Sequence, residues 1–182
     1  EVVIATTGGS VTLGAAATCA GLTINTGSIL NVGAFAITVN GASSISGKLN
    51  ITSATGVKTF AGSVTINAGG TWNNSGSSAI ILQGGLTNNG TFTAGTRSYT
   101  FMSNSQVIAG NVSIPSVVVT GVTLTNNGIF NVSSLITGTG GLTNSATGTL
   151  NFGGNVTIAT LTANASGNEV YYNGAGSQTA KA

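Results

Sequence analysis

The side chains that could carry out acid–base or nucleophilic chemistry are few in this 182-residue chain. The only carboxylates are Glu1 and Glu169, the only thiol is Cys19, and the sequence contains neither Asp nor His. A Ser-His-Asp triad, a glycosidase-type carboxylate pair and a zinc or calcium site all need residues that are missing here. We therefore expect no catalytic residue, no cofactor and no metal site, and we predict that the chain is not an enzyme.

Charge is equally scarce, because only 3% of the residues are charged. The four cations Lys48, Lys58, Arg97 and Lys181 are scattered along the chain, whereas nucleic-acid affinity depends on clustered Lys and Arg. No apolar run approaches the ~20 residues of a membrane helix. We expect neither nucleic acid nor a membrane span among the partners. For Cys19 we favour a small buried apolar residue, with an intermolecular disulfide as the alternative.

One phrase repeats along the chain: an apolar residue, then Thr, and usually Asn and Gly. The phrase begins at Leu22, Val64, Leu86, Leu124, Leu142 and Leu161. The gaps are 42, 22, 38, 18 and 19 residues, so that counting the two longest as double periods gives a mean period of about 20. No clear phrase falls near residues 43 and 105, where insertions or differently built coils would have to lie.

Short alternating runs such as Leu22–Asn25 and Val64–Asn67 place aliphatic side chains on one face and Thr or Asn on the other. Asn-Gly turns between such runs could close hairpins, but a phrase that recurs every 20 residues favours stacked coils. We predict an all-β fold: one β-solenoid domain over residues 1–182, with about nine coils. Handedness and the number of strands per coil stay open. Pro115, the only proline, should lie at a corner or an edge.

Stacking the phrases predicts columns of like residues along the rod. The outward Thr column contains Thr23, Thr65, Thr87, Thr125, Thr143 and Thr162. The corner column contains Asn25, Asn67, Asn89 and Asn127, which could form an amide ladder or simply tolerate a left-handed turn. A second apolar column contains Leu30, Trp72, Phe92, Phe130 and Leu150. Thr, Ser and Asn can stack this closely without the repulsion between like charges.

Several stretches are similar to the β-strand-repeat surface proteins of Bacteroidota. They are Glu1–Ile4, Ala17–Asn25, Gly27–Gly33, Gly85–Phe92 and Asn168–Thr179. The resemblance implies a long secreted protein, often exported by the type IX system, that forms filaments or adhesins at the cell surface and in some cases serves gliding motility. It also implies that the closing motif continues into another repeat, so that Ala182 lies inside a longer protein.

These observations lead us to expect a structural module of an extracellular filament or cell-surface adhesin. Its partners would be neighbouring repeats or subunits stacked end to end, and surface glycans are a further possibility. One alternative is a solenoid that binds glycan or ice on a flat polar face. The other is a self-assembling filament subunit whose end coils pair between molecules.

Overall fold

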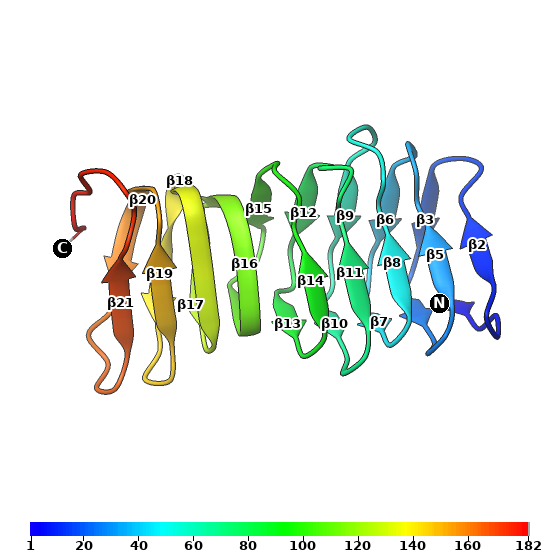
Figure 1. The fold of residues 1–182 in the computed structure, drawn as a ribbon, viewed down its shortest axis with the longest axis horizontal. Helices are drawn as coiled ribbons and strands as arrows, with labels where there is room; N and C mark the ends of the chain where they lie inside the picture. Colours follow the sequence, from blue (N-terminus) through cyan, green and yellow to red (C-terminus); the bar gives the residue numbers. More distant parts are fainter. Residues whose placement is uncertain (182) are drawn as a thin grey trace.

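A computed structural model describes residues 1–181 as a rod of stacked parallel β-strands (Figure 1). Each coil of about 20 residues runs along three faces in turn, and nine coils are stacked in the described residues. Every strand pairing is parallel, and no helix occurs in residues 1–181. The predicted β-solenoid of about nine coils is therefore confirmed. At the ~4.8 Å spacing of paired strands the rod is about 40 Å long.

The strands fall into three faces, which we number in the order that the chain visits them. Face 1 contains β1 (Val2–Ile4), β4 (Leu22–Ile24), β7 (Ser43–Ile45), β10 (Val64–Ile66), β13 (Leu86–Asn88) and β17 (Thr123–Asn126). Face 2 contains β2 (Ser10–Thr12), β5 (Ile29–Asn31), β8 (Lys48–Asn50), β11 (Thr71–Asn73), β14 (Thr91–Thr93), β19 (Thr149–Phe152) and β21 (Glu169–Tyr172). Face 3 contains β3 (Ala17–Cys19), β6 (Ile37–Val39), β9 (Lys58–Phe60), β12 (Ile80–Leu82) and β15 (Tyr99–Met102).

Three long strands continue from one face to the next. They are β16 (Gln106–Thr120), β18 (Ile129–Asn144) and β20 (Asn155–Thr162). We call residues 1–105, with coils 1–5, block one, and residues 106–181, with coils 6–9, block two. Strands of block one have only three or four residues, whereas β16 alone has 15 and lies on all three faces.

The winding follows from alternation of side chains along each strand. On face 1 the outer two residues of a three-residue strand point inward, as Leu22 and Ile24 do around Thr23. On face 2 the middle residue points inward, as Leu30 does. The inward residues form one apolar core along the rod. Viewed in Figure 1, the chain rises along the near face, crosses the top and descends behind while advancing leftward, which makes the coil right-handed.

The two positions without a clear phrase are occupied by coils of different construction. In coil 3, β7 places Ser43 where neighbouring coils have Leu22 and Val64. In coil 6, the long strand β16 starts at Gln106. Pro115 lies within β16 at a register shift between Ile114 and Ser116, where the strand passes from face 2 to face 3.

Candidate functional site

The predicted Thr column forms two separate rows on face 1. In block one, Thr23, Thr65 and Thr87 are aligned, with Ser44 between the first two. In block two, Thr125, Thr143 and Thr162 are aligned. The rows do not join, because Thr87 pairs with Ala109 whereas Thr125 pairs with Val107 of the same strand. The prediction of one continuous column is wrong, since β16 shifts the register by two residues.

Both interpretations of the corner column are wrong: its four Asn side chains form no amide ladder, and none of the four residues has the positive φ of a left-handed turn. Asn25 and Asn67 are two coils apart, and Ser46 occupies the corner position in the coil between them. The backbone N–H of Ser46 donates to Ile24 O, and that of Asn67 donates to Ile45 O, each one coil below. The Asn67 side chain donates to Ser44 Oγ at 3.0 Å and to Ser46 Oγ at 2.9 Å, and not to another amide. Asn89 and Asn127 are exposed to solvent.

The buried amides belong to the residue one position earlier in the phrase. Asn126 and Asn144 lie in the core, and Asn126 Nδ2 donates to Asn144 Oδ1 at 2.9 Å. Asn126 Nδ2 also lies 3.0 Å from Gly128 O, and Asn126 Oδ1 accepts the N–H of Gly128 at 3.1 Å. Alternation could have revealed this, because residues two apart share a face and the first Asn of Leu-Thr-Asn-Asn-Gly therefore points inward with Leu.

The outward amide ladder lies on face 2, in a column that the sequence analysis did not select. Asn50 Nδ2 donates to Asn31 Oδ1 and Asn73 Nδ2 donates to Asn50 Oδ1, both at 2.8 Å. Block two repeats the arrangement in part. There, Asn151 donates to the aligned Asn131 at 2.9 Å, and Asn131 donates to the aligned Ser113 Oγ at 2.9 Å and diagonally to Asn111 Oδ1 at 3.2 Å. Each side chain thus bonds its neighbour one coil below, as in stacked Asn ladders.

The second apolar column follows the same division into blocks. Leu30, Leu49, Trp72 and Phe92 are aligned in block one. Phe130 pairs with Leu150 in block two. Trp72 contacts Phe60 and Phe92 with ring centroids 5.1 and 6.0 Å apart. These residues form the core behind face 2.

Lys58 is the one charged side chain that is fully buried among residues 1–181. Its ammonium group donates to four backbone carbonyls: Gly33 O at 3.2 Å, Phe35 O at 2.8 Å, Thr55 O at 2.7 Å and Gly56 O at 2.5 Å. A buried charge is tolerated only when it is well hydrogen-bonded, and this cage provides such bonds. Burial nevertheless lowers the pKa of Lys58 below that of an exposed lysine. The cage ties together the loops of two successive coils.

A second buried polar cluster lies between coils 4 and 5. Trp72 Nε1 donates to Tyr99 Oη at 3.1 Å, Asn74 Nδ2 lies 3.3 Å from the same oxygen, and Tyr99 Oη donates to Ala94 O at 3.2 Å. Burial raises the pKa of Tyr99 well above its ordinary value. The phenol is therefore a neutral structural bridge.

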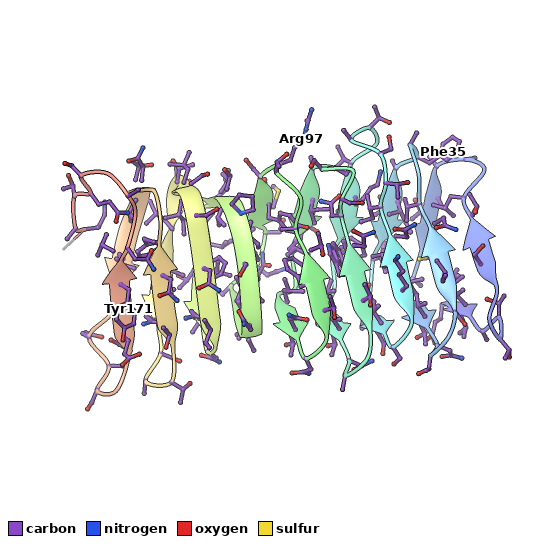
Figure 2. All side chains as sticks on the ribbon, viewed as in Figure 1. Phe35, Arg97 and Tyr171 are labelled. Carbon is purple, nitrogen blue, oxygen red and sulfur yellow. The ribbon has the colours of Figure 1, made fainter. Side chains whose placement is uncertain are left out.

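The remaining side chains that could react or bind a metal do not form clusters in the described residues. Cys19 is half-buried on the inner side of β3, and burial raises the pKa of its thiol. No three metal-ligating side chains gather anywhere in residues 1–181. The described residues also contain no helix with the length and hydrophobicity of a membrane span. Phe35, Arg97 and Tyr171 point outward from the rod (Figure 2).

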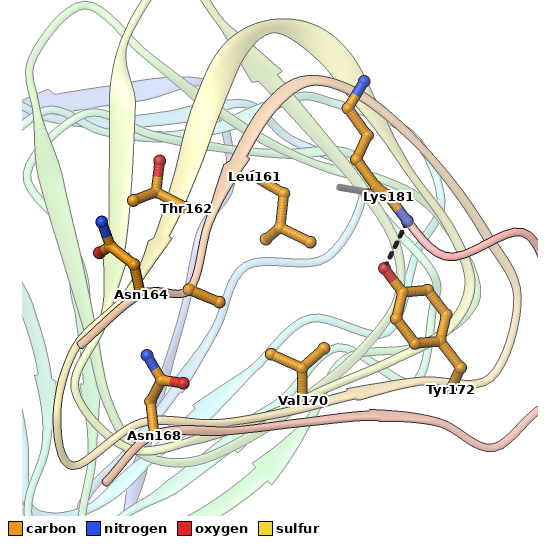
Figure 3. A pocket seen from close by; sticks show the side chains of 8 residues that line it. Leu161, Thr162, Asn164, Asn168, Val170, Tyr172 and Lys181 are labelled. Carbon is orange, nitrogen blue, oxygen red and sulfur yellow. Dashed lines mark hydrogen bonds between the residues drawn. The ribbon is translucent and has the colours of Figure 1, made fainter. Parts of the chain in front are cut away.

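Several hollows on the surface of the rod are shallow grooves. One of about 540 Å³ lies at coil 9, where Leu161, Val170 and Tyr172 face one another and the Lys181 N–H donates to Tyr172 Oη at 2.8 Å (Figure 3). Another, of about 420 Å³, lies on face 1 where Gly141 separates Thr123 from Thr160. Neither contains a carboxylate or an imidazole.

One row of outward side chains continues through both blocks without a register shift. It lies on face 3 and consists of Thr18, Thr38, Thr59, Ile81, Thr100, Val118, Thr137 and Thr157. All of these side chains are β-branched and uncharged. The row is the longest regular surface feature of the described rod.

Comparison with protein-family models, with curated proteins and with solved structures gave no match to this chain.

Proposed function

We propose that the chain is a structural module of an extracellular filament or cell-surface adhesin. In this proposal it acts as a stiff rod and has no catalytic role. The observation that carries the proposal is the repetition of the same side-chain positions over nine stacked coils, with the bonding groups directed along the rod. Ladders that join successive coils on at least two faces resist bending, and a chain with only 3% charged residues presents little electrostatic barrier to neighbouring rods.

The resemblance to surface repeat proteins of Bacteroidota supports the extracellular part of the proposal. The partners would then be neighbouring repeats or subunits placed end to end. End coils of a solenoid present unpaired strand edges, and head-to-tail contacts that do not close generate filaments. In one form of this proposal, the chain is a separate subunit, and the filament is held together by non-covalent contacts between the end coils of successive molecules.

Electron microscopy of the purified chain, and of the protein encoded by its full open reading frame, tests this function. We expect elongated particles, a fold that withstands protease, and labelling by antibody on intact cells. Compact particles that neither stack nor belong to an elongated parent protein would overturn it. Antibody labelling only after cell lysis would overturn the surface location while leaving the rod intact.

The unbroken row on face 3 favours a second candidate function, binding of a regular ligand surface such as ice or a glycan. Methyl and hydroxyl groups repeat there at the coil spacing of ~4.8 Å. A thermal-hysteresis assay tests ice binding, with Thr59→Lys as the variant that breaks the row near its middle. Absence of hysteresis in the unmodified chain would eliminate ice.

A further inference from the structure

We propose that the rod contains a hinge at a seam on face 2, between β14 in coil 5 and β16 in coil 6. The stack would bend and open there before any other interior pair of coils separates. The biological role of such a hinge rests on the proposed function, whereas the existence of the hinge depends only on the structure of the chain.

The first observation is that the strand ladder of face 2 is interrupted at the seam. Strands β2, β5, β8, β11 and β14 form one five-stranded sheet, and within the described residues no ladder joins β14 to β16. The N–H of Thr91 and the carbonyl of Thr93 bond to coil 4. Because alternate residues of a parallel strand direct their polar groups to opposite neighbours, the N–H and carbonyl of Phe92 face coil 6 without a ladder partner.

The second observation is that the apolar core reaches the surface at the seam. A groove of about 560 Å³ is lined by Phe92 and Ala94 on one side and by Ile114 and Pro115 on the other. Phe92 is only half-buried, whereas Trp72 in the preceding coil is fully buried. Pro115 has no N–H to offer a neighbouring strand.

The opposite corner of the rod is firmly closed, which makes it the axis of bending. Gln106 Nε2 donates to Leu82 O at 2.8 Å and to Met102 O at 2.9 Å, while Gln106 Oε1 accepts the N–H of Gly85 at 3.0 Å. On face 3, β15 and β16 pair over four consecutive residues, Tyr99–Met102 with 117–120. At the corner between faces 1 and 2, Asn88 Nδ2 donates to Asn111 O at 2.6 Å.

On face 2, the strand of coil 5 is held to block one and has no ladder to block two, which localises the opening to this face. The Trp72, Asn74 and Tyr99 cluster joins coils 4 and 5, and Phe92 packs edge-on against Tyr99 with centroids 5.8 Å apart. Separating coils 4 and 5 on face 2 would break ladder bonds and this cluster. Separating coils 5 and 6 there breaks no ladder bond.

Pairs of spin labels measure the hinge directly in the intact chain. In a Cys19→Ala background, Thr93→Cys with Ser113→Cys places one label on each side of the seam. The matched pair, Ile129→Cys with Thr149→Cys, joins directly opposed outward residues of coils 7 and 8. We expect a distance distribution at least about twice as broad across the seam as in the matched pair, since only the seam lacks a ladder. Equal widths, with native circular dichroism in both variants, would overturn the hinge.

Hydrogen exchange gives an independent test without substitutions. We expect the Phe92 amide to exchange at least about 100-fold faster than the Trp72 amide, because the ladder protects only the latter. Equal protection would show that the seam is closed and would overturn the hinge. A rod that does not form at all is distinguishable, since it would broaden the matched label pair and expose the Trp72 amide as well.

Discussion

Blocks one and two wind the same coil with different strands, and they build their corners differently. Block one makes corners from turns between strands of three or four residues and fills one corner with the ammonium group of Lys58. Block two carries single strands around its corners. Both blocks bury Asn amides, which are those of Asn74 and Asn88 in block one and of Asn126 and Asn144 in block two. The comparison teaches that the coil is set by its inward apolar columns, whereas the corners can be built in more than one way.

The largest expected effect concerns the corner of block one. We expect Lys58→Met to lower the free energy of unfolding by about 4 kcal/mol, because four buried carbonyls lose their donor. Lys48→Met is the matched control, since Lys48 is half-exposed on face 2, and it should change stability by less than about 0.5 kcal/mol. Urea unfolding followed by circular dichroism measures both. A loss below about 1 kcal/mol in Lys58→Met would mean that the cage is not what holds this corner.

The corresponding test of block two removes a core amide. We expect Asn126→Ala to cost about 2–3 kcal/mol, because the N–H of Gly128 and the side chain of Asn144 lose a partner inside the core. Asn127→Ala, at the exposed neighbouring position, should cost less than about 0.5 kcal/mol. Equal costs for the two variants in urea unfolding would contradict the inward placement of Asn126.

The phenol of Tyr99 should give block one a dependence on pH. Burial raises its pKa above the ordinary value of 10.0, so the folded state keeps a proton that the unfolded state loses. Above pH 10 the unfolded state therefore binds fewer protons, and stability should fall by about 1 kcal/mol per pH unit from this group.

Tyr99→Phe provides the comparison for that dependence. We expect the variant to cost about 1–2 kcal/mol at pH 8, because Trp72 Nε1 loses its acceptor. Its stability should then fall less steeply than that of the unmodified chain between pH 10 and 11. Parallel stability curves over that interval, obtained by urea unfolding, would refute a buried neutral phenol.

The smallest expected effect concerns the outward amide ladder, which both blocks share. Asn50→Ala should cost about 0.5–1 kcal/mol, since its ladder bonds are partly exposed to water. Thr91→Ala, on the same face at an exposed position, should be nearly neutral. Differential scanning calorimetry resolves the difference, and a melting temperature that is lowered equally in both variants would argue against the ladder.

The sequence was sufficient to predict the coil, because period and alternation are local signals. Leu22 and Val64 mark inward positions, and a spacing near 20 residues requires stacking. The coil containing β7 was expected from the spacing alone, because Ser43 occupies the buried position at which Leu22 and Val64 begin the phrase in neighbouring coils. The register shift in β16 escaped detection, since Gln106 replaces the apolar residue on which the alignment depended.

The polar interactions were less predictable, because their partners are far apart in the sequence. Lys58 bonds to carbonyls up to 25 residues away, and carbonyls carry no sequence signature. Strict alternation of side chains along the strand predicts that Asn126 points inward with Leu124. The Asn-Gly turn signal instead led to the prediction that Asn127 forms the corner column. On face 2 the middle residue of each strand points inward, whereas on face 1 the first and third residues do. The repeated phrase lies on face 1 and therefore did not reveal that the third residue of a face 2 strand, such as Asn50 in β8, points outward.

The outward amide ladder gives the rod a direction. Asn73 donates to Asn50 and Asn50 to Asn31, and in block two Asn151 donates to Asn131 and Asn131 to Asn111. Every one of these amides donates toward the N-terminal end of the rod, so their dipoles point in the same direction and add together. The aligned positions in the two end coils are Thr12 and Tyr171, whose hydroxyl groups can donate as well as accept. The direction of donation is therefore a property of the interior of the rod.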